Sequence, residues 1–308
     1  MTLLHALQKN KVPDFSPPNH VVDGLQYLVY TGSSAYGVSN DTSDLDIYGF
    51  SIPPKEMIFP HLAGQILGFG KQINRFEQYQ QHHIKYNEKE YDFTIYSIVK
   101  FFQLCMDNNP NMVDVLFVPE RCILFASEIG KLVRENRKIF LHKGGLSKYI
   151  GYSFSQMHKI ETKNPIGKRK AEVEKYGYDV KFGYHVVRLL NEIEQILAEG
   201  DLDLERSREQ LKSIRRGEWA IGQIKDYFNN KKDSLDKLYV TSSLPYEPRE
   251  KEIRELLVNC LEIRFGSIDN LIKTEKSINC FINDARKILR EESEIIVNEL
   301  KEKYYGGS

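Results

Sequence analysis

Two aspartates separated by one residue, Asp44 and Asp46, have the spacing needed to present paired carboxylates. Leu45 and Ile47 alternate with them, which is typical of a β-strand with one face toward a hydrophobic core. Side chains two residues apart on a strand point to the same side, so we expect the two carboxylates to project together. Ionised carboxylates this close repel each other, which raises their pKa unless a cation neutralises them. The pattern therefore predicts a site for a hard cation such as Mg²⁺.

A short run of small residues upstream, Gly32, Ser33 and Ser34, could bind phosphate. It follows an apolar, strand-like run over 25–30, and ten residues separate Ser33 from Asp44. Glycine lets backbone N–H groups approach a phosphate closely, and serine hydroxyls add further donors. Mg²⁺ is usually held by one or two carboxylates together with substrate phosphates. The combination predicts nucleotide transfer from a nucleoside triphosphate (NTP); the alternative is that the aspartates are ordinary surface residues of a turn.

The stretch 32–50 resembles the signature of the DNA polymerase β-like nucleotidyltransferase superfamily: Gly-Ser, a gap, then Asp-hydrophobic-Asp. It is similar to the bacterial and phage branch of predicted nucleotidyltransferases that is associated with RNA repair. Similar blocks follow at 91–98, 109–111, 175–190 and 215–219. The resemblance implies an α+β fold, with a mixed sheet flanked by helices and then a helical domain. It also implies NTP as the donor and two Mg²⁺ or Mn²⁺ ions as cofactors.

A third carboxylate is expected at Asp92, because two-metal transfer needs ligands for both ions. Phe93 and Ile95 alternate with Asp92, which leaves its carboxylate on the face opposite the core. Glu90 would share that face and is the rival, and the resemblance favours Asp92. The ordinary interpretation, a charge that protects an edge strand, suits Glu88 and Glu90 better.

Three basic or titratable residues, Lys181, His185 and Arg188, are expected on one face of a long helix. The sequence predicts that this helix begins after an N-cap at Asp179 and ends at Gly200. We expect its start to face the site, so that Lys181 or Arg188 neutralises the triphosphate of the NTP. The alternative is the plain polar face of an amphipathic helix, opposite an apolar stripe.

The acceptor is predicted from basic residues outside that helix. Zero net charge argues against a protein that coats nucleic acid nonspecifically, but a local basic patch is compatible with it. The candidates for acceptor phosphates are Lys168, Arg169, Lys170, Arg215 and Arg216. Their ordinary interpretations are a solvated basic loop and a helix C-terminus. An RNA end is the expected acceptor; the alternatives are a protein or small-molecule acceptor and a catalytically inactive nucleotide-binding module.

The length of 308 residues allows two domains and a sizeable core. We expect an extended, proline-containing lead-in over 1–19, a catalytic domain over 20–143, and a helical domain over 144–308 that closes the cleft. The predicted boundary is Gly144-Gly145. Between 249 and 305 the pattern predicts two or three charged, amphipathic helices.

Several classes of protein are disfavoured. The sequence has no run of 18 apolar residues and no apolar signal-peptide core at its start, so neither a membrane span nor secretion is expected. Its four scattered cysteines are expected to be reduced thiols in the cytoplasm of a bacterial or phage-infected cell. A G-x-x-x-x-G-K-[ST] loop is absent, which disfavours P-loop kinases and ATPases. His82 and His83 have no third partner at metal spacing, so no metal role is expected for them.

Overall fold

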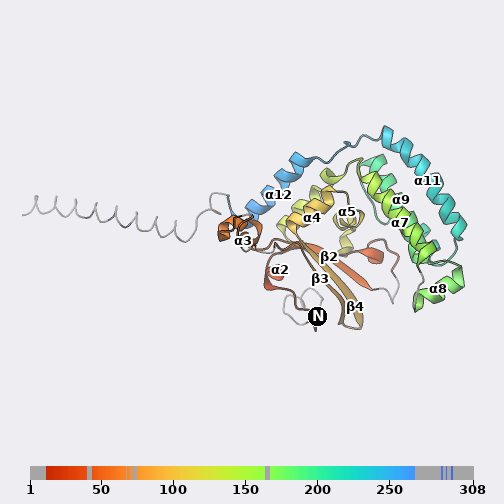
Figure 1. Ribbon diagram of the computed structural model, residues 1–308, viewed down its shortest axis with the longest axis horizontal. Coiled ribbons are helices and arrows are strands. Elements are labelled where there is room, and N and C mark those ends of the chain that lie inside the picture. Colours follow the sequence, from red (N-terminus) through yellow and green to blue (C-terminus); the bar gives the residue numbers. More distant parts are fainter. Residues whose placement is uncertain are drawn as a thin grey trace, which may run out of the picture.

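The computed structural model describes residues 12–39, 44–66, 68–70, 72, 75–163 and 167–267, with the isolated positions 286, 289 and 293. Within these residues a five-stranded sheet has the order β3-β4-β2-β1-β5 (Figure 1). The strands are β1 Leu25–Tyr30, β2 Leu45–Ser51, β3 Gln78–Tyr86, β4 Lys89–Ser97 and β5 Ile123–Ala126. The central strands β2 and β4 are parallel and the other neighbours are antiparallel, so the sheet is mixed.

The two faces of the sheet pack against different partners, as the alternation along β2 and β4 predicts. Ile47, Phe93 and Ile95 are buried on one face, in a smaller cluster with Val12 and Val21. Tyr27, Val29, Phe50 and Tyr96 belong to the larger cluster formed with the helices. Burying each large apolar side chain stabilises the fold by roughly 1.5–3 kcal/mol. Since Asp46 alternates with Ile47, its carboxylate lies on the helix-covered face.

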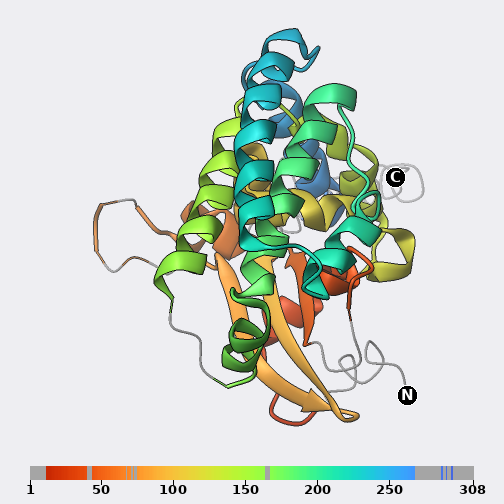
Figure 2. The ribbon, with the colours of Figure 1, turned by 90° about the vertical axis from the view of Figure 1, so that its right-hand side faces the viewer.

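The helices occupy most of the described chain after β5 and largely cover that face, although the first described helix contributes Val21 to the smaller cluster. They are α2 Asn19–Asp23, α3 Lys55–Ile58, α4 Ile98–Met106, α5 Pro110–Phe117, α6 Glu128–Glu135, α7 Gly145–Thr162, α8 Lys168–Tyr176, α9 Val180–Glu199, α10 Arg208–Arg215, α11 Ile221–Thr241 and α12 Glu250–Phe265. The long helices α7, α9 and α11 lie side by side (Figure 2). A mixed sheet with flanking helices confirms the predicted α+β fold class.

Capping residues begin α4 and α9 and end α9, and the two ends predicted for the long helix, Asp179 and Gly200, are confirmed. The Ser97 hydroxyl accepts a hydrogen bond from the Lys100 N–H at 3.2 Å and begins α4. Asp179 Oδ1 accepts one from the Lys181 N–H at 3.0 Å and begins α9. Gly200, in the left-handed conformation with φ +61°, ends α9. These caps satisfy backbone groups that the first and last turns leave without partners.

The larger hydrophobic cluster is continuous across the predicted domain boundary. It contains Val29 from β1, Leu190 from α9 and Cys260 from α12. Helix α12 packs against α4 and α6, so the described end of the chain returns to the sheet-containing half (Figure 1). The division at 143 and 144 stays a prediction. Helix α12 is the first of the helices expected after 249, and the remaining ones fall outside the described residues.

The lead-in is only partly described, and 1–11 fall outside the described residues. Over 12–18 the chain forms neither strand nor helix, as its prolines predict. Among the helices that the structure describes, none is both long and apolar enough to cross a membrane.

Candidate active site

Asp46 and Asp92 are register partners on the parallel strands β2 and β4, so their carboxylates share one face of the sheet. Burial raises the pKa of Asp46, and the neighbouring Asp92 charge raises it further. The exposed Asp44, just before β2, adds to this repulsion, whereas the Lys181 ammonium opposes it. The arrangement brings two predicted carboxylates together and leaves the third at the exposed start of the strand.

Gly32 packs directly against Asp46. It begins the short 3₁₀ turn Gly32–Ser34 with φ +58°, a conformation that side chains disfavour. A Cβ at Gly32 would lie 2.4 Å from Asp46 Oδ2. The Thr31 N–H donates to the Asp46 carbonyl oxygen at 2.9 Å, which fixes the turn to β2. The first N–H groups of such a turn have no partner within it, so they can bind an anion beside Asp46.

A bulge in β3 presents two histidines to Asp92. The register shifts between Gln81 and Ile84, and His83 has φ +60°. The His83 N–H donates to Asp92 Oδ1 at 2.8 Å, and His82 Nδ1 lies 3.5 Å from Asp92 Oδ2. The contact of these histidines with Asp92 was missed, because nothing in the sequence pattern locates a bulge.

Glu90, the rival carboxylate, has another partner. Its Oε1 contacts His83 Nδ1, and this hydrogen bond raises the pKa of His83. The register places Asp92, not Glu90, opposite Asp46. The geometry therefore favours Asp92 as the second carboxylate of the site.

The donor set fits a hard cation only in part. Among the described residues, no three His, Cys, Asp or Glu side chains are grouped closely enough to form a complete metal site. Asp46 and Asp92 nevertheless supply oxygen donors whose mutual repulsion a cation would relieve, and Mg²⁺ takes its remaining ligands from substrate phosphates and water. The pair fits Mg²⁺ held jointly by the protein and an NTP.

The start of α9 faces the carboxylates through Lys181. Its side chain is exposed, and its charge lowers the pKa of Asp46. One turn later, burial and the charge of Arg188 hold the pKa of His185 well below its usual value, with Lys181 and Arg215 adding to the effect. His185 is therefore neutral at neutral pH, and its buried Nδ1 has no hydrogen-bond partner among the described residues.

Arg188 does not face Asp46 and Asp92. Its guanidinium is buried and contacts the carboxylates of Asp114 and Glu192 and the hydroxyl of Tyr36. Gln195, further along the same stripe, is also buried. Of the two cations expected to neutralise the triphosphate, Arg188 is therefore already paired in the interior and Lys181 remains. The alternative of a plain polar face does not hold either, because Gln195 donates to the Asp203 carbonyl oxygen at 3.3 Å and Arg188 contacts Tyr36 in the loop that follows Gly32. Arg188 anchors α9 to that loop.

The acceptor candidates separate into two groups. Arg169 lies 4.4 Å from the Phe182 ring, and Arg215 donates to the Val38 carbonyl oxygen at 3.3 Å, so both lie near the start of α9 or the Gly32 loop. Lys170 and Arg216 instead pair at the surface with Glu174 and Glu218. The Lys168 side chain is outside the described part.

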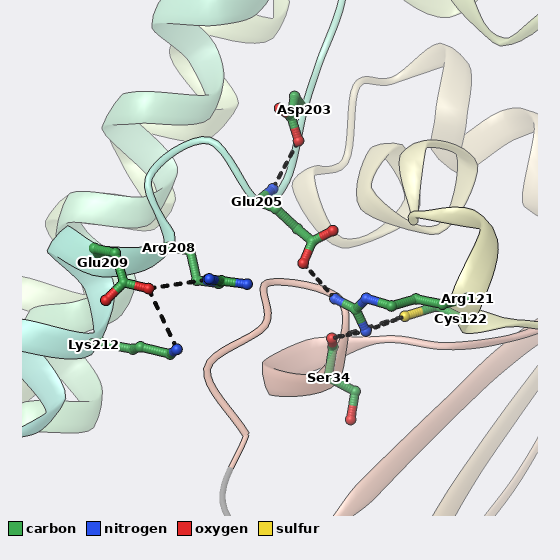
Figure 3. A network of polar contacts seen from close by, with 8 residues as sticks. All are labelled: Ser34, Arg121, Cys122, Asp203, Glu205, Arg208, Glu209 and Lys212. Atoms are coloured by element: carbon green, nitrogen blue, oxygen red, sulfur yellow. Dashed lines mark hydrogen bonds and ion pairs between the residues drawn. The ribbon is translucent and has the colours of Figure 1, made fainter.

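A polar network behind the Gly32 turn was also missed (Figure 3). Arg121 donates to the Ser34 carbonyl oxygen at 3.0 Å and pairs with Glu205 at 2.7 Å. Arg208 packs its aliphatic stem near Gly37 and pairs with Glu209 at 3.1 Å. The contacts of Arg121 tie the turn to the segment before α10, and they join residues too far apart in sequence for spacing to reveal.

Comparison with known proteins gives three results. A sequence model of the RlaP family, described as an RNA repair pathway DNA polymerase β family, matches residues 4–224. An uncharacterised 38.9 kDa protein of Enterobacteria phage T4, from the nrdC–mobD intergenic region, is 28% identical over 137 residues, covering 44% of this chain and 38% of the phage protein. The crystal structure of a nucleotidyltransferase-like protein from Exiguobacterium sibiricum 255-15 aligns with 79% of this chain and 86% of its own length, at 13% identity and a TM-score of 0.26.

Proposed function

The chain belongs to the RNA repair pathway DNA polymerase β family, whose model matches more than half of its length, and on that premise we propose that it transfers a nucleotide from an NTP to a hydroxyl at an RNA end. The match bears out the resemblance expected from residues 32–50. In the proposed reaction the acceptor oxygen forms a bond to the α-phosphorus. The bond from that phosphorus to the bridging oxygen breaks, and pyrophosphate leaves.

One observation carries this proposal: Asp46 and Asp92 are register partners beside a glycine turn, with the Lys181 charge facing them. Asp46 and Asp92 would hold Mg²⁺ or Mn²⁺, and Asp44 is proposed as a further ligand. When bound, such ions lower the pKa of the acceptor hydroxyl and neutralise charge on the phosphates. The proposed count of two ions rests on the family.

The chain's own residues would orient the donor. The N–H groups of the Gly32 turn and the Ser33 hydroxyl would bind phosphate oxygens near Asp46. Lys181 supplies a positive charge that already acts on Asp46. His185, which is neutral, can exchange a hydrogen bond there but adds no charge. Together these groups favour one pose of the triphosphate and raise the reaction rate by orientation and electrostatics.

Two alternative functions compete with this proposal. Transfer to a protein side chain or a small molecule is favoured by zero net charge, because nucleic-acid binding usually relies on excess Lys and Arg. A catalytically inactive nucleotide-binding module is disfavoured by the paired carboxylates. The proposed reaction is placed in the cytoplasm of a bacterial or phage-infected cell.

The test incubates the full chain with each α-³²P-labelled NTP and Mg²⁺, with and without total RNA, and separates the products on a denaturing gel. We expect label in RNA, lost on addition of EDTA. Label in the protein when RNA is omitted would replace RNA with a protein acceptor. No label in any fraction, although NTP binds, would indicate the inactive module.

A further inference from the structure

Three cationic side chains surround the ring of Phe182 at the start of α9. Lys159 Nζ lies 6.0 Å from the ring centroid, Lys163 Nζ 5.9 Å and Arg169 Cζ 4.4 Å. We call Lys159, Lys163, Arg169 and Phe182 the Phe182 cluster. Its members come from the last turn of α7, the residue after it, the first turn of α8 and the first turn of α9. The fold therefore brings together two cations from the end of α7 and one from α8 on a ring that α9 supplies.

The cluster has more positive charge than the protein neutralises. Asp179 Oδ2 pairs with Arg169 Nη2 at 2.8 Å, and Asp179 also caps α9. Within the described ranges, no carboxylate lies at ion-pair distance from Lys159 or Lys163. Cations gathered on one aromatic ring are attracted to the ring but repel one another. A bound polyanion would relieve that repulsion.

The position of the cluster points to the acceptor. Phe182 directly follows Lys181, whose charge acts on Asp46, and Arg169 contributes to the field that keeps His185 neutral. The Phe182 cluster therefore lies at the end of α9 whose Lys181 acts on Asp46. A polyanion held at the cluster would lie at the end of α9 that faces the proposed NTP site.

We propose that the Phe182 cluster binds backbone phosphates of the RNA acceptor near its reacting end. This inference rests on the proposed function and deepens it, because it assigns the acceptor path to Lys159 and Lys163 in addition to Arg169. Phosphodiester groups suit the site because lysine binds phosphate as a point charge and arginine as a two-pronged donor. The surface cations Lys170 and Arg216, paired with carboxylates of their own, are not part of the proposed path.

The test measures binding of a fluorescein-labelled, single-stranded synthetic RNA by anisotropy over about 50–200 mM salt. The cluster variant is Lys159→Ala with Lys163→Ala. The matched control is Lys148→Ala with Lys251→Ala, which removes the same charge from exposed positions. Lys148 lies on α7, about 16 Å along the helix axis from Lys159. We expect about tenfold weaker binding in the cluster variant, and a salt slope flatter by roughly 1.4, which corresponds to two lost phosphate contacts.

The control variant should bind RNA like the unaltered protein, and NTP affinity, measured by calorimetry, should be unchanged in both variants. Cluster and control variants with equal RNA affinity and slope would overturn the assignment, even if the protein transfers nucleotides to RNA. Weaker NTP binding with unchanged RNA binding would also overturn it, in favour of a donor site. Cluster-dependent RNA binding without any transfer would instead sustain the assignment and contradict the proposed function.

Discussion

At the scale of single residues, Gly32 is constrained twice. Its backbone has a positive φ, and its missing side chain leaves room for the Asp46 carboxylate, which a Cβ would approach to 2.4 Å. The close approach brings the N–H groups of the turn next to the carboxylate that is proposed to bind metal. Glycine at this position is thus a requirement of the site as well as of the turn.

Replacement of Gly32 should separate these two constraints. We expect Gly32→Ala to lower kcat/KM for nucleotide transfer about a hundredfold, because the added methyl displaces Asp46. The control is Gly200→Ala. Gly200 also has a positive φ (+61°), but a Cβ added there would meet only Leu244, at an ordinary contact distance of 3.5 Å. The control should lose about 1 kcal/mol of stability by thermal unfolding and keep its activity. Full activity of Gly32→Ala would show that the turn does not position Asp46.

Sequence alone could locate Asp44 and Asp46, because strand alternation and the upstream Gly-Ser are both local signals. It could also rank Asp92 above Glu90 by resemblance. The contacts of His82 and His83 with Asp92 could not be predicted, because they depend on a bulge, and a bulge is set by how β3 pairs with β4.

At the scale of elements, the polar stripe of α9 has two roles along its length. Lys181 is exposed at the open end beside Asp46, whereas Arg188 is buried against Asp114 and Glu192 two turns later. The contact of Arg188 with Tyr36 joins the helix to the loop after the Gly32 turn. Helix α9 therefore fixes the distance between the loop and its own first turn.

Two substitutions on this stripe should affect different properties, one NTP affinity and the other the free energy of unfolding. Lys181→Ala should weaken NTP binding about tenfold but change the free energy of unfolding by no more than ~0.5 kcal/mol. Arg188→Met should cost about 3–5 kcal/mol, because Asp114 and Glu192 would stay buried without their cation. Calorimetry and urea unfolding measure the two effects. Unchanged NTP affinity in Lys181→Ala, or unchanged stability in Arg188→Met, would contradict these roles.

The cost of Arg188→Met should depend on pH. Burial already raises the pKa of Asp114 and Glu192 in the folded protein, so the folded state retains protons that the unfolded state releases. Stability contributed by such groups falls as pH rises above the unfolded carboxyl pKa of about 4. The stability lost on Arg188→Met should therefore be smaller at about pH 4 than at neutral pH.

The limits of α9 were predictable, since Asp179 and Gly200 are strong local signals at its ends. The burial of its polar stripe was not, because the partners Tyr36 and Asp114 are distant in sequence and belong to the half that contains the sheet. A helix with polar residues on one face is normally solvated there. Only tertiary packing shows that this face is an internal contact.

At the scale of the whole molecule, one hydrophobic core runs from the sheet through α9 to α12. The candidate site combines the register partners Asp46 and Asp92 of β2 and β4 with the charge of Lys181 from the first turn of α9. The α+β class and the order of strands followed by helices were predictable from periodicity and resemblance. The short edge strand β5 was not, because four residues are too few to show an alternation.

The most direct test of the central claim compares nucleotide transfer by three amide variants: Asp46→Asn, Asp92→Asn and Glu90→Gln. Each should stay folded, and Asp46→Asn should melt no lower than the unaltered protein, because it removes a charge that burial disfavours. We predict no detectable transfer of label from α-³²P-labelled NTP by the two asparagine variants, and normal transfer by Glu90→Gln. Transfer at the normal rate by Asp46→Asn would contradict the account, and an inactive Glu90→Gln beside an active Asp92→Asn would refute the assignment of the second carboxylate.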